Sequence, residues 1–261
     1  MLFPEGTVVQ VQLDTHKPAL VLLHGWGYDN NCWPEYLLEQ LKSSYNLILL
    51  DLPGHGQDTY VADQRNTLEQ LDQWIVATKR YLPLQYTLMA WSLGAQIAIR
   101  MAHNDPRIKR LILMAVNPKF ITGDGWPTAM VPEMLLQFMQ GYQALATKTL
   151  RRFASLQAQG SVNPKLLAAR IIQLMPVQTQ KAFGLNLLQV LDERAHLCQL
   201  WQPCYLELAK NDELVPCQWV DELQLPNNVQ VNYVEGGHGY LLEQQSISRK
   251  MAKFMHPGVA R

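Results

Sequence analysis

The amino-acid sequence predicts an α/β protein in which a mostly parallel, doubly wound sheet carries an inserted helical lid. Short apolar segments alternate with helical segments as far as residue 116. Strand signals then stop, and only helical segments follow until about residue 190. Strand and helix alternate again after that point. We therefore expect residues 1–117 and 192–261 to form the core and residues 118–191 to form the lid.

The first half of the chain supplies most of the predicted sheet. Residues 7–13 alternate in polarity like an edge strand, whereas Ala19–Leu23 is a continuous apolar run that is typical of a strand buried on both faces. Thr67 and Gln70 have the spacing of a capping box at the start of a helix. The other expected elements are a helix over 33–42, a strand over 46–50, a helix over 67–81, a strand over 86–90, a helix over 94–103 and a strand over 111–116.

The second half begins with an irregular segment rich in proline and glycine, at Pro118, Gly123, Gly125 and Pro127. Helical segments are expected over 132–159, 164–175 and 178–191. They are followed by a strand over 204–209, a helix over 216–223, a strand over 229–234 and a closing helix over 240–254. A helical block placed after the fifth strand is most simply a lid over the carboxyl edge of the sheet.

The composition gives no indication of a nucleic-acid or membrane partner. The 261 residues include 22 basic and 22 acidic side chains, and no run of apolar residues is long enough to span a bilayer. The first residues lack the pattern of a secretory signal, so we expect a cytoplasmic protein, and we expect a monomer. Four cysteines without metal-ligand spacing indicate free thiols, and we expect no metal and no cofactor; they are Cys32, Cys198, Cys204 and Cys217.

Ser92 stands between the expected strand over 86–90 and the helix that follows it. A serine on a sharp turn between strand and helix is exposed to a histidine from elsewhere in the chain, and the next residue's N–H points at the reacting carbonyl oxygen. The small residues Ala90 and Gly94 allow strand and helix to approach closely, although the usual pattern has glycine where Ala90 stands. Ser92 is therefore a candidate nucleophile, and the alternative is an ordinary helix N-cap.

Two further side chains follow strands in the order expected of a catalytic triad. Asp212 comes after the strand over 204–209, and His238 comes after the strand over 229–234 in a glycine-rich loop. Serine, acid and histidine in this order are typical of the α/β-hydrolase fold. His238 would take the proton of the serine hydroxyl, and Asp212 would orient its ring. Asp192 and Asp221 are the competing acids, and both lie in helical patterns.

The loop His24-Gly25-Trp26-Gly27 also follows an expected strand, and its glycines suit close approach to a ligand. We expect the N–H groups of Trp26 and Leu93 to form the oxyanion hole. The Trp26 side chain either lines the acyl pocket or packs in the core. His55 and Asp51, in the turn after the next strand, are interpreted as structural.

The lid is basic. Between residues 141 and 190 there are six cationic side chains and no Asp or Glu, in a chain without net charge: Lys148, Arg151, Arg152, Lys165, Arg170 and Lys181. Clustered charges of this kind steer an acidic partner toward a surface. The alternative is an ordinary solvated helix face.

Several motifs together resemble one family. They are His24-Gly25-Trp26-Gly27, Asp51-Leu52-Pro53-Gly54, Trp91-Ser92-Leu93-Gly94, Trp126-Pro127, Arg152-Phe153 with Leu156-Gln157, and Leu214-Val215-Pro216. From about residue 19 to its end the chain resembles the pimeloyl-[acyl-carrier protein] methyl ester esterases of biotin synthesis. The elbow and the His-Gly motif occur in very many hydrolases. The tryptophan beside the nucleophile and the Arg-Phe-x-x-Leu-Gln segment are more specific.

The resemblance implies a carboxylesterase that releases methanol from pimeloyl methyl ester bound to acyl carrier protein. It implies that Ser92, Asp212 and His238 are the triad and that Trp26 and Leu93 contact the substrate. It assigns further substrate contacts to the lid segment Phe153, Ala154, Ser155, Leu156 and Gln157. It places the contacts with the acyl carrier protein at Lys148, Arg152, Lys165 and Arg170.

Two alternatives stay open at this point. One is a general carboxylesterase or thioesterase that acts on free short-chain esters. The other is a hydrolase-fold binding protein without catalytic activity. A haloalkane dehalogenase is disfavoured, because its nucleophile would be a carboxylate where Ser92 stands.

Overall fold

The computed structural model describes residues 8–10, 14–58, 66–175 and 182–256. Among these residues seven strands form one sheet in the order β1-β3-β2-β4-β5-β6-β7. β1 is antiparallel to β3, and the other neighbouring strands are parallel. The strands are β1 Val8–Gln10, β2 Ala19–Leu23, β3 Asn46–Leu50, β4 Tyr86–Trp91, β5 Ile108–Met114, β6 Cys204–Ala209 and β7 Val229–Val234. The predicted fold class is confirmed.

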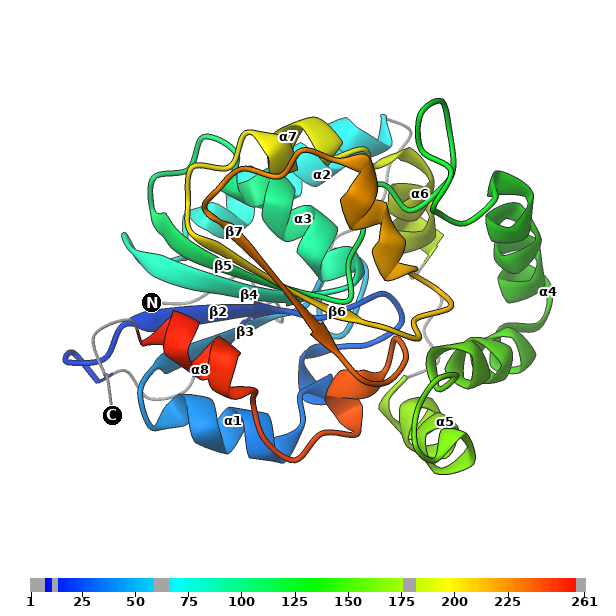
Figure 1. Cartoon of the computed structure of the whole chain (residues 1–261), viewed down its shortest axis with the longest axis horizontal. Coiled ribbons are helices and arrows are strands. Elements are labelled where there is room, and N and C mark those ends of the chain that lie inside the picture. The colour runs from blue at the N-terminus through cyan, green and yellow to red at the C-terminus, as the bar shows by residue number, and fades with distance from the viewer. Residues whose placement is uncertain (1–7, 11–13, 59–65, 176–181, 257–261) are drawn as a thin grey trace.

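Helices cover both faces of the sheet (Figure 1). α1 and α8 lie on one face, and α2, α3 and α7 lie on the other, whereas α4 and α5 project beyond one end of the strands. The helices are α1 Glu35–Lys42, α2 Thr67–Lys79, α3 Leu93–Ala102, α4 Pro132–Gln157, α5 Pro164–Leu174, α6 Ala182–Val190, α7 Arg194–Cys198 and α8 Arg249–Met255. Short 3₁₀ helices are η1 Asn30–Cys32, η3 Cys217–Glu222 and η4 Tyr240–Leu242.

The central strands are buried along their whole length, because helices pack on both faces. Every residue of β2, β3 and β4 is buried. Register aligns the ends of the strands: Ala90 of β4 pairs with Leu23 of β2 and with Leu113 of β5. The loops that leave these strands therefore begin at one common edge of the sheet, which is where ligands bind in open parallel sheets.

The segment between β5 and β6 is helical, and α4, α5 and α6 are together called the helical insertion below. The sequence predicts one helical run over 132–159, and α4 does extend from Pro132 to Gln157, but it is kinked at Leu145, whose φ is −148° and ψ 70°. α7, which follows the insertion, is not predicted from the sequence. The exact division of the chain into core and lid stays a prediction.

Several predicted helix ends are wrong. The cap of α2 is Asn66, whose side chain accepts a hydrogen bond from the Leu68 N–H, so Thr67 is not the start of a capping box. The closing helix predicted over 240–254 is two elements, because Ser248 caps a new helix by accepting from the Met251 N–H. The element predicted over 216–223 is the 3₁₀ helix η3. Parts of the predictions over 7–13 and 178–191 lie outside the described residues.

Within the described ranges, none of the helices combines the length and the apolar character that crossing a membrane requires. The same part of the chain contains no group of three or more His, Cys, Asp and Glu side chains that would hold a metal ion.

Candidate active site

The turn at Ser92 has the strained backbone of a nucleophile elbow. Ser92 adopts φ 54° and ψ −123°, a region that L-residues with a side chain rarely occupy. α3 begins at the next residue, Leu93, one residue earlier than predicted. A Cβ added at Gly94 would lie only 2.3 Å from the carbonyl oxygen of His24, so this position requires glycine. Ala90 is fully buried within β4, and its methyl group is accommodated in the sheet.

The structure brings Ser92, His238 and Asp212 together. His238 Nε2 lies 3.0 Å from Ser92 Oγ, and His238 Nδ1 lies 2.8 Å from Asp212 Oδ2. The histidine and the aspartate are buried, with 2% and 4% of their surfaces exposed. These are the contacts a general base needs: one ring nitrogen at the hydroxyl and the other at an acid that orients the ring.

Backbone groups hold the aspartate in place. Asp212 Oδ1 accepts hydrogen bonds from the N–H groups of Leu214, at 2.9 Å, and Val215, at 2.8 Å. Only Oδ2 faces the histidine. The carboxylate is therefore fixed by its own loop, and its free rotation is restricted.

The competing acids lie elsewhere. Asp192 is not inside a helix but between α6 and α7, where it forms ion pairs with Arg194 and Lys119. Burial raises the pKa of Asp192, but the bonds from these two cations outweigh burial, and the net pKa is lowered. Asp221 is an exposed residue of η3.

The loop after β2 passes directly beside the nucleophile. A Cβ added at Gly25 would lie 3.2 Å from the Cβ of Ser92 and 3.8 Å from its Oγ. Leu93, the first residue of α3, has no carbonyl one turn earlier in its helix to accept from its N–H. The Trp26 side chain is buried, and it packs edge-on against Phe138, Tyr142 and Phe153. The Trp26 ring therefore lines the pocket and also packs against the insertion.

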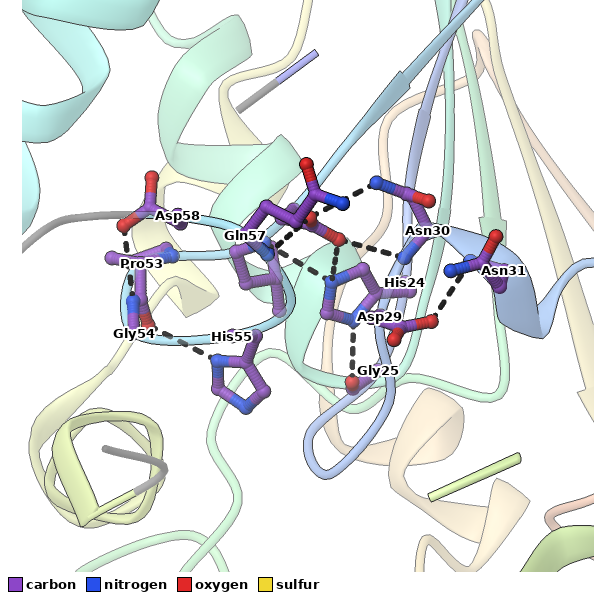
Figure 2. A network of polar contacts seen from close by, with 12 residues as sticks. His24, Gly25, Asp29, Asn30, Asn31, Pro53, Gly54, His55, Gln57 and Asp58 are labelled. Atoms are coloured by element: carbon purple, nitrogen blue, oxygen red, sulfur yellow. Dashed lines mark hydrogen bonds and ion pairs between the residues drawn. The ribbon is translucent and has the colours of Figure 1, made fainter. Parts of the chain in front are cut away.

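A buried polar network supports this loop (Figure 2). His24 Nδ1 donates to the carbonyl of Gly25, while His24 Nε2 accepts from the Leu52 N–H. Asp51 accepts from the backbone and side chain of Asn30 and from the Gln57 N–H. These contacts are those of a structural network, in keeping with the interpretation of Asp51 from the sequence.

An apolar pocket opens at Ser92. Its cavity volume is about 110 Å³. Its walls are formed by the helical insertion, by the loop that follows β5 and by the core. The lining residues are Trp26, Ser92, Phe120, Met130, Met134, Leu135, Phe138, Phe153, Leu156, Leu185, Leu188 and Leu214. None of these twelve residues carries a charge.

Only part of the predicted lid segment reaches this pocket. Phe153 and Leu156 line it, but Ala154, Ser155 and Gln157 do not. Ser155 is exposed and its hydroxyl donates to the Arg151 carbonyl, which is one helical turn earlier. Most of the other wall residues were not predicted, because apolar residues at helical spacing have the same pattern in a pocket wall as in a core.

The predicted basic residues lie mostly on the outside of the insertion. Lys148, Arg151 and Arg152 on α4 and Lys165 on α5 are exposed, and none forms an ion pair with a described residue. Arg170 differs, because its guanidinium donates to the carbonyl of Leu242. Lys181 lies outside the described residues.

Comparison with known proteins identifies relatives along almost the whole chain. Residues 20–246 match the model of an alpha/beta hydrolase family. The pimeloyl-[acyl-carrier protein] methyl ester esterase of Nitrosomonas europaea is 34% identical over 242 residues, which cover 90% of this chain and 94% of the relative. The biotin biosynthesis bifunctional protein BioHC of Cellvibrio japonicus is 33% identical over 84% of this chain and 43% of its own length.

Among solved structures, an esterase from Exiguobacterium antarcticum superposes with a TM-score of 0.77. The match covers 97% of this chain and 94% of that structure at 21% identity, so it supports the fold alone. The family model and the esterase relative carry the assignment further. This chain belongs to the α/β hydrolase family and, within it, to the pimeloyl-[acyl-carrier protein] methyl ester esterases.

Proposed function

We propose that this protein is a serine carboxylesterase of biotin biosynthesis. It hydrolyses the methyl ester of pimeloyl-[acyl-carrier protein] to pimeloyl-[acyl-carrier protein] and methanol. The observation that carries the proposal is the hydrogen-bonded series from Asp212 through His238 to Ser92 at an uncharged pocket. Relatives named for this esterase and for biotin biosynthesis support the choice of substrate.

In the first half of the reaction, Ser92 Oγ attacks the ester carbonyl carbon while His238 Nε2 takes the hydroxyl proton. The ring becomes a cation, which the buried carboxylate of Asp212 stabilises. The negative charge that develops on the carbonyl oxygen is met by the N–H groups of Leu93 and Trp26. When the carbon–oxygen bond to the methoxy group breaks, His238 returns the proton and methanol leaves.

In the second half, a water molecule attacks the acyl-serine ester. His238 takes a proton from this water and returns it to Ser92 Oγ as the acyl bond breaks. The products are a free carboxylic acid at the end of the acyl chain and the regenerated serine. All atoms are accounted for by one ester and one water giving one acid and one alcohol.

The pocket suits the ester better than the product. Its walls present aromatic rings, leucines and methionines to the substrate's methylene groups, and none of the twelve lining residues is charged. An ionised carboxylate would lose its hydration there without gaining a cationic partner, which is unfavourable. The acid product is therefore expected to leave readily.

The acyl carrier protein is joined to the other end of the acyl chain, away from the methyl ester. It must therefore remain outside the pocket while the ester reaches Ser92. The exposed cations Lys148, Arg151 and Arg152 on α4 and Lys165 on α5 are suited to an acidic carrier in this position.

The test is a direct assay of purified protein with methyl-pimeloyl carrier protein as substrate. We expect methanol release with the matching change in mass of the carrier, and rescue of a biotin-requiring strain that lacks its own esterase. Ser92→Ala should abolish turnover without changing the folded structure. Absence of turnover by the native protein, or full activity of Ser92→Ala, would refute the proposal. Labelling of Ser92 by a fluorophosphonate would separately exclude a non-catalytic binding protein.

A further inference from the structure

Gln157, the last residue of α4, forms hydrogen bonds to two different loops of the site. Its side-chain Oε1 accepts from the hydroxyl of Tyr28 at 2.8 Å. Its backbone carbonyl accepts from the N–H of Gly239 at 2.9 Å. Gln157 and Tyr28 are almost completely buried, with 0% and 1% of their surfaces exposed. Bonds in such an environment are not exchanged with water and are costly to lose.

The two loops are those that carry the groups around the nucleophile. Tyr28 is two residues beyond Trp26, and Gly239 directly follows His238. The end of α4 is also in van der Waals contact with the histidine loop. A Cβ added at Gly237 would lie 1.6 Å from the carbonyl oxygen of Gln159, so the loop approaches this turn as closely as glycine permits.

Aromatic rings make a second connection between the same loops. The ring of Tyr28 lies 4.7 Å from that of Trp91, and the ring of Trp91 is stacked 6.0 Å from the imidazole of His238. Moving Tyr28 would therefore disturb the ring that packs on the histidine. Burial raises the pKa of Tyr28 well above its usual value, so the hydroxyl stays a donor.

The Gln157 amide is directed away from the substrate pocket. Its oxygen is occupied by Tyr28, its nitrogen points to Met175 Sδ at 3.9 Å, and the residue does not line the pocket. This differs from the substrate contact that the family resemblance implies for Gln157.

We infer that Gln157 and Tyr28 are positioning residues, which hold the histidine loop and the oxyanion loop at a fixed separation on either side of Ser92. The inference rests on the proposed serine esterase mechanism, but not on the identity of the acyl group. It assigns to the end of the insertion a role in placing the catalytic groups, in addition to forming the pocket.

The experiment compares Tyr28→Phe, Gln157→Leu and the double variant. Tyr28→Phe removes one oxygen atom and leaves the ring that packs against Trp91, so it remains informative even where Gln157→Leu fails to fold. Two matched controls exist. Tyr45→Phe removes a buried hydroxyl that donates to the Met255 carbonyl at the opposite edge of the sheet, and Gln143→Leu alters an exposed side chain of the same helix, α4.

The measurements are kcat and KM on free methyl esters of two acyl lengths, the rate of Ser92 labelling by a fluorophosphonate, and the free energy of unfolding. Small displacements of catalytic groups reduce rates steeply, so we expect kcat and the labelling rate to fall about 10- to 100-fold in Tyr28→Phe and Gln157→Leu. KM should stay within about twofold for both esters. The double variant should have a kcat no lower than that of the less active single variant, because both substitutions remove the same hydrogen bond. The controls should retain native rates.

An unchanged kcat in folded Tyr28→Phe would overturn the inference. So would a rise in KM that depends on acyl length, which is the signature of a substrate contact, or additive losses in the double variant. If native protein fails on methyl-pimeloyl carrier protein but is labelled at Ser92, the proposed substrate is wrong, and the labelling rates still decide this inference.

Discussion

The loops at the carboxyl edge of the sheet and the outer face of the helical insertion are held in contrasting ways. In the loops, Asp212, His238 and His24 are buried, and each has defined hydrogen-bond partners. On the insertion, the cations of α4 are exposed and form no ion pair with any described residue, and apolar side chains such as Leu145 and Leu166 are 61% and 67% exposed.

The contrast follows from what each region is proposed to do. Proton transfer requires catalytic groups within about 0.5 Å of the productive geometry, which only packed and bonded side chains maintain. Attraction between a basic surface and an acidic carrier acts across several ångströms of water and tolerates mobile side chains. The two regions meet at Gln157, where the end of α4 bonds to both loops.

The largest effect on kcat is expected from a substitution that keeps the shape of the triad but changes its hydrogen bonding. In Asp212→Asn, the amide oxygen still accepts from Leu214 and Val215, but the amide nitrogen faces His238 Nδ1. The ring is then held in the wrong tautomer, with no acceptor at Nε2 for the serine proton. We expect kcat to fall about 10⁴-fold with little change in KM.

Steady-state kinetics on a free methyl ester measure this loss. Asp221→Asn is the matched control, because Asp221 is an exposed aspartate of η3, and it should retain native activity. A fall of less than about tenfold in Asp212→Asn would contradict the proposed role of Asp212.

Sequence and structure agree best where a residue is defined by its position after a strand. Ser92, Asp212 and His238 each follow a strand of one parallel sheet, and topology alone brings such positions to a common edge. Gly94 beside Ser92 and the glycines around His238 also indicate these loops. The sequence therefore predicts both the fold class and the grouping of these side chains.

The residues of the pocket wall and the contacts of Gln157 cannot be predicted from the sequence, for a physical reason. Phe120 and Leu188 are apolar residues like any in the core, and only the packing of the insertion decides which of them face a cavity. The kink at Leu145 alters the direction of α4. Gly141 lies one turn earlier, close to Thr149, but a single glycine within a helical run does not by itself predict a kink. The direction of the Gln157 side chain depends on Tyr28, which is 129 residues away in the chain.

An intermediate effect is expected from reversing charges on the insertion. In Lys148→Glu combined with Arg152→Glu, we expect KM for carrier-linked substrate to rise about tenfold or more, because each reversal replaces an attraction with a repulsion. The kinetics on free methyl esters should not change. Increasing salt should reduce the difference from native protein.

The matched control is Lys250→Glu combined with Lys253→Glu on α8, which makes the same change in net charge at the opposite end of the molecule (Figure 1). Equal effects of both double variants on KM would indicate a response to net charge rather than to a docking surface. Unchanged KM in both would favour the alternative in which the protein acts on free esters.

The smallest effect is expected at a buried carboxylate beneath the histidine loop. Glu207 of β6 accepts hydrogen bonds from Tyr240, close to His238, and from Tyr205, Ser248 and Asn232. Burial raises the pKa of Glu207 above its ordinary value, although these donors act in the other direction. The folded protein therefore keeps the Glu207 proton to higher pH than the unfolded chain does.

Because the folded state binds more protons in this window, the contribution of Glu207 to the free energy of unfolding decreases as pH rises from about 4.3, the ordinary carboxyl pKa, to its folded pKa. Glu207→Gln cannot ionise and lacks this decrease. Urea unfolding of both proteins across this window should show the free energy of unfolding of the variant increasing relative to that of native protein as pH rises. Above the window the difference should be constant.

Gln159→Leu, which alters an exposed uncharged side chain, should differ from native protein by the same amount at every pH. The idea would be contradicted if the difference in the free energy of unfolding between Glu207→Gln and native protein did not change with pH, or shifted in favour of native protein as pH rises. Ionisation of Glu207 would then not destabilise the folded protein. The buried loops and the solvated insertion would differ in geometry alone.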